Sequence, residues 1–193
     1  MKKIYQYLII GLLMIGTLGC SSSSKLAEQS LKDFFLALQS GELRVAQDII
    51  LQDTHNIKLI YSGSTETDII KSMFASIKYE VLSVEKDQGN VKFKINVTMC
   101  NSEIAVKSAL DELTNMGLSG SILTGFQRAL AQSPEVLIKN FNNAQQTTKN
   151  ATITLTEKDG KYYIIADQEL YNLIGKDTDM VIKIYNTLNR NNN

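Results

Sequence analysis

The chain holds very few of the side chains that carry chemistry at active and metal sites. Among its 193 residues there are one His and two Cys. A zinc cage takes four Cys and His ligands, so these residues are too few to build one. A hydrolytic triad needs a His as its base, and His55 stands in the polar stretch 53–56, where we expect a solvated imidazole. The residue types therefore argue against both kinds of site, and no cofactor is expected.

The N-terminal residues have the organisation of a secretory signal. Lys2 and Lys3 give a basic start, and an apolar run follows at 7–18. The run is shorter than the roughly 18–20 residues that a membrane-spanning helix needs, so a permanent span is the weaker interpretation. Residues 1–19 are therefore predicted to be a signal peptide. An ordinary signal peptide followed by a coincidental Cys, or a short anchor, is the alternative.

Cys20 stands at the end of this segment, directly after Gly19. A small residue before a Cys at this distance resembles a bacterial lipobox, in which the Cys thiol receives a diacylglycerol and becomes the first residue after cleavage. The commonest lipobox has Leu three positions before the Cys and a small residue two before, whereas Thr17 and Leu18 hold these places in reverse. The resemblance implies a lipoprotein that is lipidated at Cys20.

A lipid on Cys20 would hold the folded domain on a membrane. Each buried CH₂ of an acyl chain contributes about 0.8 kcal/mol, and two chains anchor a protein where one holds it only marginally. Residues 20–25, rich in Ser, are predicted to be a flexible tether. The predicted location is the cell membrane or the outer membrane, with the domain facing outside the cytoplasm. The membrane, bound through the lipid on Cys20, is then the first expected partner.

The charge balance argues against another class of partner. Lys and Arg together number 20, as do Asp and Glu, so the formal net charge is zero. A nucleic-acid-binding protein needs a broad basic surface, and none is expected here. Removal of residues 1–19 takes away Lys2 and Lys3 and leaves a slightly acidic domain. Nucleic acid is therefore not an expected partner.

Apolar spacing predicts helices first and strands later. Apolar residues that recur every three or four positions indicate an amphipathic helix at 27–38, with Ser24 as a candidate cap and Gly41 as its end. Two further helices are predicted at 42–51 and 65–77.

Alternating apolar residues indicate two hairpins. Their strands are predicted at 79–84 with 91–100, and at 151–156 with 162–165. The inner face of the first of these strands is ambiguous. Cys100 falls on the polar face of its strand, which favours exposure, and with Cys20 acylated it has no partner for an intramolecular disulfide.

Helical spacing returns at 101–149, where Ser133 and Pro134 mark a helix start. A short helix is predicted at 168–174, with Gly175 as its stop. The chain is expected to end in a helix at 179–188 and a disordered tail at 189–193.

Three amphipathic helices followed by antiparallel hairpins resemble the nuclear-transport-factor-two-like fold, which ketosteroid isomerase shares. Three stretches carry the likeness, at 31–42, 153–165 and 170–175. Within the second, Lys-Asp-Gly-Lys-Tyr-Tyr-Ile stands where the family usually has Asp-Gly-Lys-Trp and an apolar residue. More narrowly, the chain resembles small bacterial lipoproteins that carry uncharacterised domains of this fold.

This resemblance implies a single α+β domain at 26–188. Its N-terminal helices would pack on a curved antiparallel sheet that forms a cone, as in cystatin-like folds. The helices at about 101–149 would be an insertion into the minimal fold. Homodimers are common in this fold, so the resemblance allows a homodimer, although no sequence feature demonstrates one.

The resemblance also suggests where a ligand would bind. Aromatic residues could line the cone, and Tyr61, Tyr79, Phe93 and Tyr163 are the candidates for such a lining. Enzymes of this fold place an Asp or His base with Tyr donors inside the cone. Asp167 follows a predicted strand, and we expect it to cap the next helix rather than to act as a base.

Two functional hypotheses follow. The favoured one is a membrane-anchored envelope lipoprotein whose non-catalytic domain binds a small apolar ligand, a peptide or another envelope protein. The alternative is an enzyme of the ketosteroid-isomerase type that uses an Asp and Tyr pair inside the cone. A buried carboxylate within hydrogen-bond reach of a Tyr hydroxyl would favour the enzyme, whereas a filled cone would favour binding or a structural role.

Overall fold

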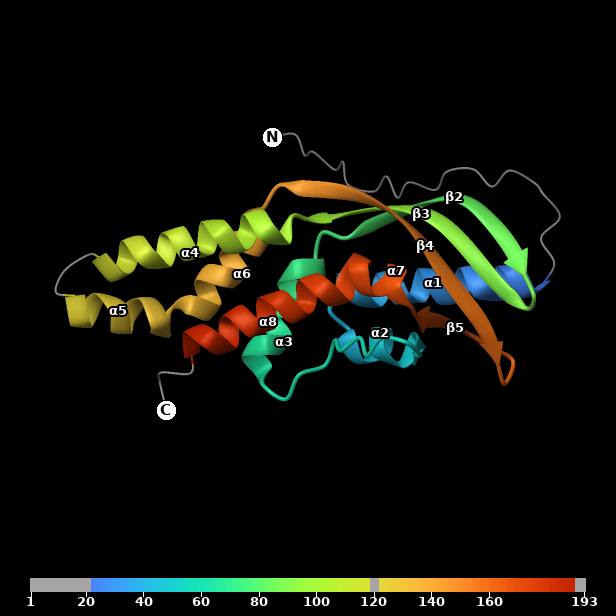
Figure 1. The fold of residues 1–193 in the computed structure, drawn as a ribbon, viewed down its shortest axis with the longest axis horizontal. Helices are drawn as coiled ribbons and strands as arrows, with labels where there is room; N and C mark the ends of the chain where they lie inside the picture. Colours follow the sequence, from blue (N-terminus) through green and yellow to red (C-terminus); the bar gives the residue numbers. More distant parts are fainter. Residues whose placement is uncertain (1–21, 119–121, 190–193) are drawn as a thin grey trace, which may run out of the picture.

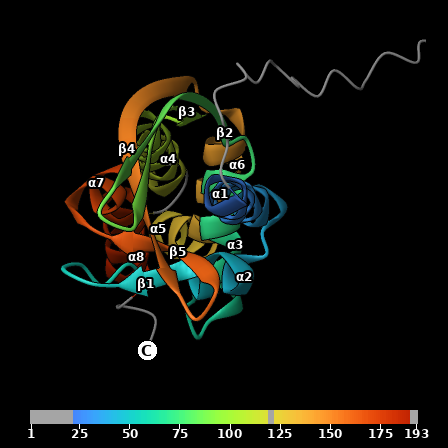
Figure 2. The ribbon, with the colours of Figure 1, turned by 90° about the vertical axis from the view of Figure 1, so that its right-hand side faces the viewer.

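A curved sheet of five strands lies over one long helix. The structure is a computed structural model that describes residues 22–118 and 122–189. The predicted signal peptide, Cys20 and residues 190–193 of the predicted tail lie outside the described residues. Figure 2 looks along helix α1 (Ser22–Ser40) and shows the strands curving around it. The expected α+β class with a curved sheet is confirmed.

The strands follow the order β1-β5-β4-β3-β2 across the sheet. Their bounds are β1 Ile50–Gln52, β2 Lys78–Asp87, β3 Asn90–Cys100, β4 Gln146–Lys158 and β5 Lys161–Ala166. The four later strands pair antiparallel, while the short β1 adds to β5 in parallel. At the other edge, the register of β2 shifts between Val81 and Ser83, so that Leu82 bulges from the ladder.

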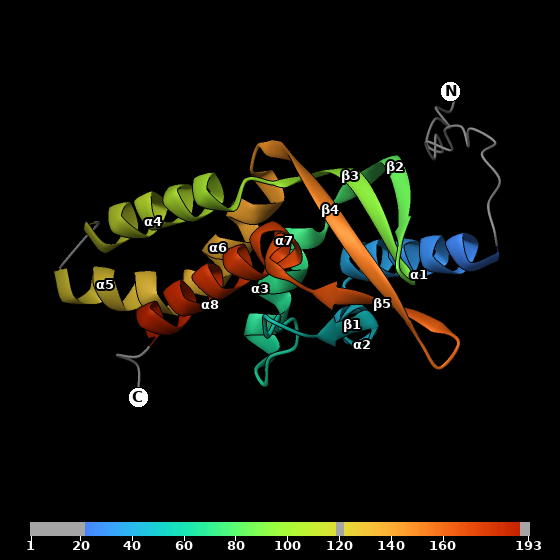
Figure 3. The same cartoon turned by 45° about the vertical axis from the view of Figure 1, so that its right-hand side comes forward.

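The remaining helices lie beneath and beside this sheet (Figure 1). They are α2 Leu43–Ile49, α3 Ser64–Phe74, α4 Ser102–Leu118, α5 Ile122–Ala131, α6 Ser133–Asn143, α7 Gln168–Leu170, the π-helical turn η1 Tyr171–Gly175 and α8 Lys176–Asn189. Figure 3 shows α4 and α5 extending away from the sheet as an arm, with α8 beside them. The helical insertion therefore spans 102–143, and β4 begins earlier than the predicted boundary near 149.

The core lies between α1 and the inner face of the sheet. The alternating residues of β3 that were predicted to face inward are all buried, and they are Val91, Phe93, Ile95, Val97 and Met99. The stripe on α1 that includes Leu31, Phe34 and Leu38 is fully buried as well. Full burial of such a side chain contributes roughly 1.5–3 kcal/mol, so this contact stabilises the whole arrangement.

Two predicted helix boundaries are corrected by the structure. The second helix was expected to reach residue 51, but it ends at Ile49 because Ile50–Gln52 pairs with β5 as strand β1. Ladder hydrogen bonds with a distant strand here outweigh the local helical spacing. At the N-terminus, α1 already begins at Ser22, so Ser24 lies inside the helix and is buried rather than capping it. Part of the predicted flexible tether is therefore helical.

Gly175 does not stop a helix, contrary to the prediction. The chain continues from α7 through η1 into α8, and the N–H of Lys176 donates to the carbonyl of Tyr171, five residues back. A Cβ on Gly175 would lie 2.6 Å from a carbon of the Tyr171 ring. The glycine is therefore required by close packing of this ring and not by a helix end.

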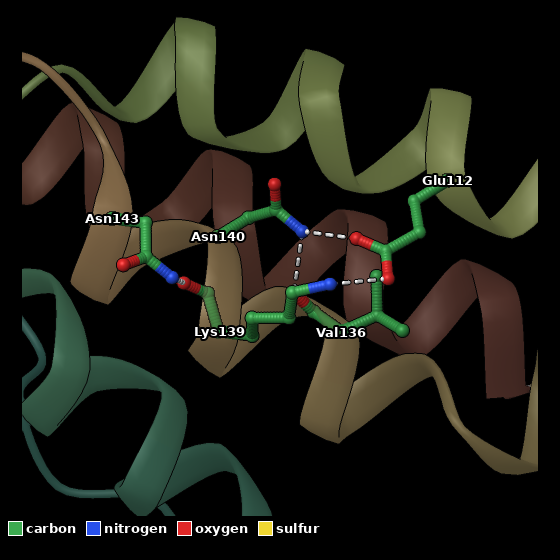
Figure 4. Close-up of polar contacts among 5 residues, drawn as sticks. All are labelled: Glu112, Val136, Lys139, Asn140 and Asn143. Atoms are coloured by element: carbon green, nitrogen blue, oxygen red, sulfur yellow. Dashed lines mark hydrogen bonds and ion pairs between the residues drawn. The ribbon is translucent and has the colours of Figure 1, made fainter.

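Polar contacts fasten the arm to the rest of the insertion (Figure 4). Lys139 Nζ lies 2.7 Å from Glu112 Oε1, and Asn140 Nδ2 donates to Glu112 Oε2 at 3.0 Å. Asn140 also donates to the carbonyl of Val136. The hydrogen bonds from Lys139 and then Asn140 lower the pKa of Glu112, so this carboxylate stays charged and links α4 to α6.

The packing predicts that truncation of two Phe side chains will lower the free energy of unfolding by unequal amounts. Phe93→Ala removes a ring that is 1% exposed, so it should lower the free energy of unfolding by about 3–5 kcal/mol in urea denaturation. Phe126→Ala removes a ring that is 51% exposed, and it should cost less than about 1 kcal/mol. Equal losses in the two variants would contradict a core centred between α1 and the sheet.

Candidate functional site

The inner face of the sheet holds two of the four predicted cone residues. Phe93 lies in the buried core, and Tyr79 on β2 pairs with Val97 of β3. The ring of Tyr79 stacks on Phe35 of α1, with 4.4 Å between centroids and 19° between planes. Burial raises the pKa of Tyr79, with the charges of Glu28 and then Asp33 adding to the effect. The Phe35 side chain of α1 thus occupies the space beside Tyr79.

The other two predicted cone residues lie elsewhere. Tyr163 on β5 pairs with Thr156, whereas Leu155 and Ile164 form the neighbouring buried pair. Since successive residues of a strand face opposite sides, Tyr163 lies on the outer face of the sheet. Tyr61 lies outside the sheet, in the segment between β1 and α3. The structure therefore does not bring the four aromatic residues together, and their part in ligand binding stays a prediction.

Tyr61 instead lines a groove between its own segment and helix α8. The groove has a volume of about 470 Å³. Its lining includes Lys58, Tyr61, Asp179, Ile182, Lys183 and Asn186. It combines charged, aromatic and apolar side chains, so we take it as the candidate functional site.

Two glutamines hold the wall of the groove that has no regular secondary structure. The Gln47 side chain donates to the carbonyl of Ile57 at 3.0 Å and accepts from the N–H of Leu59 at 2.7 Å. The Gln52 side chain accepts from the N–H of Ile57 and donates to its carbonyl. Ile57 and Leu59 are buried, so the intervening Lys58 points outward. This alternation places Lys58 at the groove.

Tyr61 is held by its neighbours in the groove. The ammonium of Lys58 lies 4.7 Å from the centroid of the Tyr61 ring, within the range of a cation–π contact. Burial, followed by the negative charge of Asp179, raises the pKa of Tyr61 to about 12. The phenol therefore keeps its proton at neutral pH and can donate a hydrogen bond to a ligand.

Asp179 connects the groove to a second aromatic pair. Its Oδ2 accepts a hydrogen bond from the Tyr171 hydroxyl at 3.1 Å, and this bond raises the pKa of Tyr171. The Tyr171 ring stacks on His55, with 4.9 Å between centroids and 13° between planes. His55 is therefore part of an aromatic stack beside the groove, and not a fully solvated loop residue as the sequence suggested.

In both Tyr–carboxylate hydrogen bonds among the described residues, the carboxylate is exposed to solvent. The bond between Tyr171 and Asp179 is exposed, whereas Tyr162 is only 6% exposed and donates at 3.3 Å to the exposed Glu157 in the hairpin of β4 and β5. Asp167 accepts from the N–H of Leu170 at 2.9 Å and caps α7, as predicted. Within residues 22–118 and 122–189, His, Cys, Asp and Glu side chains form no cluster of three or more that could hold a metal ion.

Cys100 is buried, which corrects the expected exposure. Its side chain is 1% exposed, and its thiol donates to the carbonyl of Met73 at 3.1 Å. The alternation along β3 breaks at this last residue, because the C-terminal part of α3 contacts it there. Burial raises the pKa of the Cys100 thiol to about 11, with Ser102 partly opposing the effect. The thiol is therefore protonated and unreactive at neutral pH.

Of the residues that line the groove, only Tyr61 was predicted from the sequence as part of a site. A signal was present, because Asp179, Lys183 and Asn186 recur at spacings of four and three and so share one face of a helix. Nothing in the sequence indicates that Lys58 lies across from this face. That arrangement depends on how the chain brings together residues more than a hundred positions apart.

Comparison with known proteins does not assign the chain to a family. No protein-family model matches it, and no curated protein matches it. Among solved structures, it is similar to ycdA of Bacillus subtilis, called a "putative lipoprotein", with 13% sequence identity and a TM-score of 0.35. The likeness covers 76% of this chain but 45% of the other, so the chain spans less than half of that protein. A similarity at this level carries no argument about fold or role.

None of the helices in the described ranges combines the length and the apolar character that a bilayer crossing requires.

The burial of Cys100 predicts a low thiol count in the native protein. At pH 8 a disulfide reagent such as Ellman's reagent should not label Cys100, since its thiolate is scarce and inaccessible. In guanidinium chloride the same thiol should react fully. Rapid labelling of Cys100 in the native protein, located by peptide mass spectrometry, would contradict the buried position.

Proposed function

We propose that this chain is a lipid-anchored protein of the bacterial envelope, whose domain binds a ligand or a partner without catalysing a reaction. The observation that carries the anchor is Cys20, which follows a basic start, an apolar run and Gly19. The lipid would attach to the Cys20 thiol and hold the domain at the cell membrane or the outer membrane, outside the cytoplasm. The nuclear-transport-factor-two-like relationship stays part of this proposal.

Two structural observations support binding over catalysis. The inner face of the sheet is filled by α1, with Phe34 and Phe93 fully packed there and Tyr79 stacked on Phe35. An isomerase of the ketosteroid type would need a buried carboxylate beside a Tyr hydroxyl in that interior, whereas the carboxylates of the described pairs, Glu157 and Asp179, are exposed to solvent. The groove beside Tyr61 offers side chains that can hold a ligand, and this favours a binding role.

The start of α1 bears on how the anchor would hold the domain. The helix begins at Ser22, close after Cys20 in the sequence. Little chain is then left for a flexible tether, so an anchored domain would remain near the membrane surface. Its orientation there would depend on α1, which is firmly packed in the core.

Anchoring predicts a single acylation site. In a bacterial host grown with radiolabelled palmitate, the full chain should incorporate label, and Cys20→Ala should abolish incorporation because no thiol remains at the cleavage site. The matched control is Cys100→Ala, which removes the other thiol and should leave the label unchanged. Membrane fractions and gel autoradiography give the measurement. Equal labelling of Cys20→Ala and the parent chain would refute the anchor.

A further inference from the structure

The groove between the 57–61 segment and α8 is rich in hydrogen-bond donors without partners. Lys58 and Lys183 form no ion pair within the described parts of the chain. By contrast, Lys149 is paired with Asp177 on the same helix α8 at 3.0 Å. The Tyr61 hydroxyl also has no hydrogen-bond partner among the described residues. Two ammonium groups and a phenol therefore remain available to an acceptor.

The rest of the groove lining adds apolar and acceptor character. Tyr61 contributes an aromatic ring to the lining, and the Lys58 ammonium lies over that ring. Ile182 is 6% exposed and closes the floor from α8. Asp179 is the acidic residue of the lining, and one of its oxygens accepts from Tyr171. The other oxygen can accept a hydrogen bond from a ligand.

The charges of the lining set the charge of a suitable ligand. Lys58 and Lys183 are positive and Asp179 is negative, so the lining has one net positive charge. A ligand with a single negative charge balances it, whereas a doubly charged phosphate would leave an excess of negative charge near Asp179. Ammonium groups as point charges accept a carboxylate without strict geometry.

We propose that this groove binds a small organic carboxylate that carries an apolar group and an N–H donor. The carboxylate lies between Lys58 and Lys183, the apolar group packs on Tyr61 and Ile182, and the N–H donates to Asp179. An N-acylated amino acid, or the C-terminal residue of a peptide, has this combination of groups. The inference deepens the binding role proposed above and rests on it.

The test uses a pair of probes that differ in one charge. N-acetylphenylalanine has the carboxylate, the ring and the N–H, whereas in N-acetylphenylalaninamide a neutral carboxamide of similar size replaces the carboxylate. The full chain, isotope-labelled and held in a non-ionic detergent, is titrated with each probe by NMR. We expect a dissociation constant for the acid on the order of 0.1–1 mM, given its size. The amide should bind at least about fivefold more weakly, since it loses the charged hydrogen bonds.

Charge-removing variants locate the site. Lys58→Gln and Lys183→Gln should each weaken binding of the acid by about fivefold to tenfold and leave binding of the amide nearly unchanged. The matched control is Lys107→Gln on the exposed face of α4, which should bind the acid as the parent chain does. The three substitutions are at exposed positions, so each variant should keep the parent NMR spectrum outside its own surroundings.

Three results would overturn the inference. They are equal binding of acid and amide, an unchanged affinity in both groove variants, and no binding of the acid up to its solubility limit. None of these results would bear on the proposed lipid anchor, because the palmitate experiment tests only whether Cys20 is acylated. If the parent chain incorporated no palmitate but still bound the acid in the groove, the lipid anchor would be refuted and the proposed ligand site would be retained.

Discussion

The packing of α1 against the inner face of the sheet is the contact on which the other features depend. Leu31 and Phe34 of the helix are fully buried, as is Ile95 of the facing strand. Water is excluded from this interior, and each such side chain contributes roughly 1.5–3 kcal/mol to folding. A filled interior of this kind leaves recognition to the outer surfaces of the domain. The groove at α8, assembled outside the core, is consistent with that division.

Local patterns were sufficient wherever one element meets the core along its full length. The period of two in β3 and the three- and four-residue spacing in α1 follow directly from burial of one face. The patterns gave the wrong secondary structure where pairing with a segment distant in the sequence determines the conformation. Ile50–Gln52 is an example, because it is a strand only through its pairing with β5. Cys100 is buried for a similar reason, through its contact with Met73. The groove could be predicted only in part, since periodicity shows one helical face but not what lies opposite.

Gly175 links the local geometry of the chain to the candidate site. The π turn at η1 inserts an extra residue before α8 and so changes the direction in which the following side chains point. The missing Cβ lets the Tyr171 ring lie against the backbone of Gly175. From there the Tyr171 hydroxyl reaches Asp179, and its ring reaches His55. Gly175, which was predicted to end a helix, thus helps to position Asp179 at the groove.

The bulge at Leu82 has a consequence for how neighbouring molecules meet. Strand β2 is an edge of the sheet, and its unpaired side would be a template for strands of other chains. Proteins tethered to one membrane share a thin layer, in which identical edges lie at the same height and collide often. A shifted register, with Lys78 and Glu80 along the same strand, makes continuous pairing between two such edges unfavourable. If the domain is anchored as proposed, this irregular edge would disfavour strand pairing between neighbouring copies on one membrane.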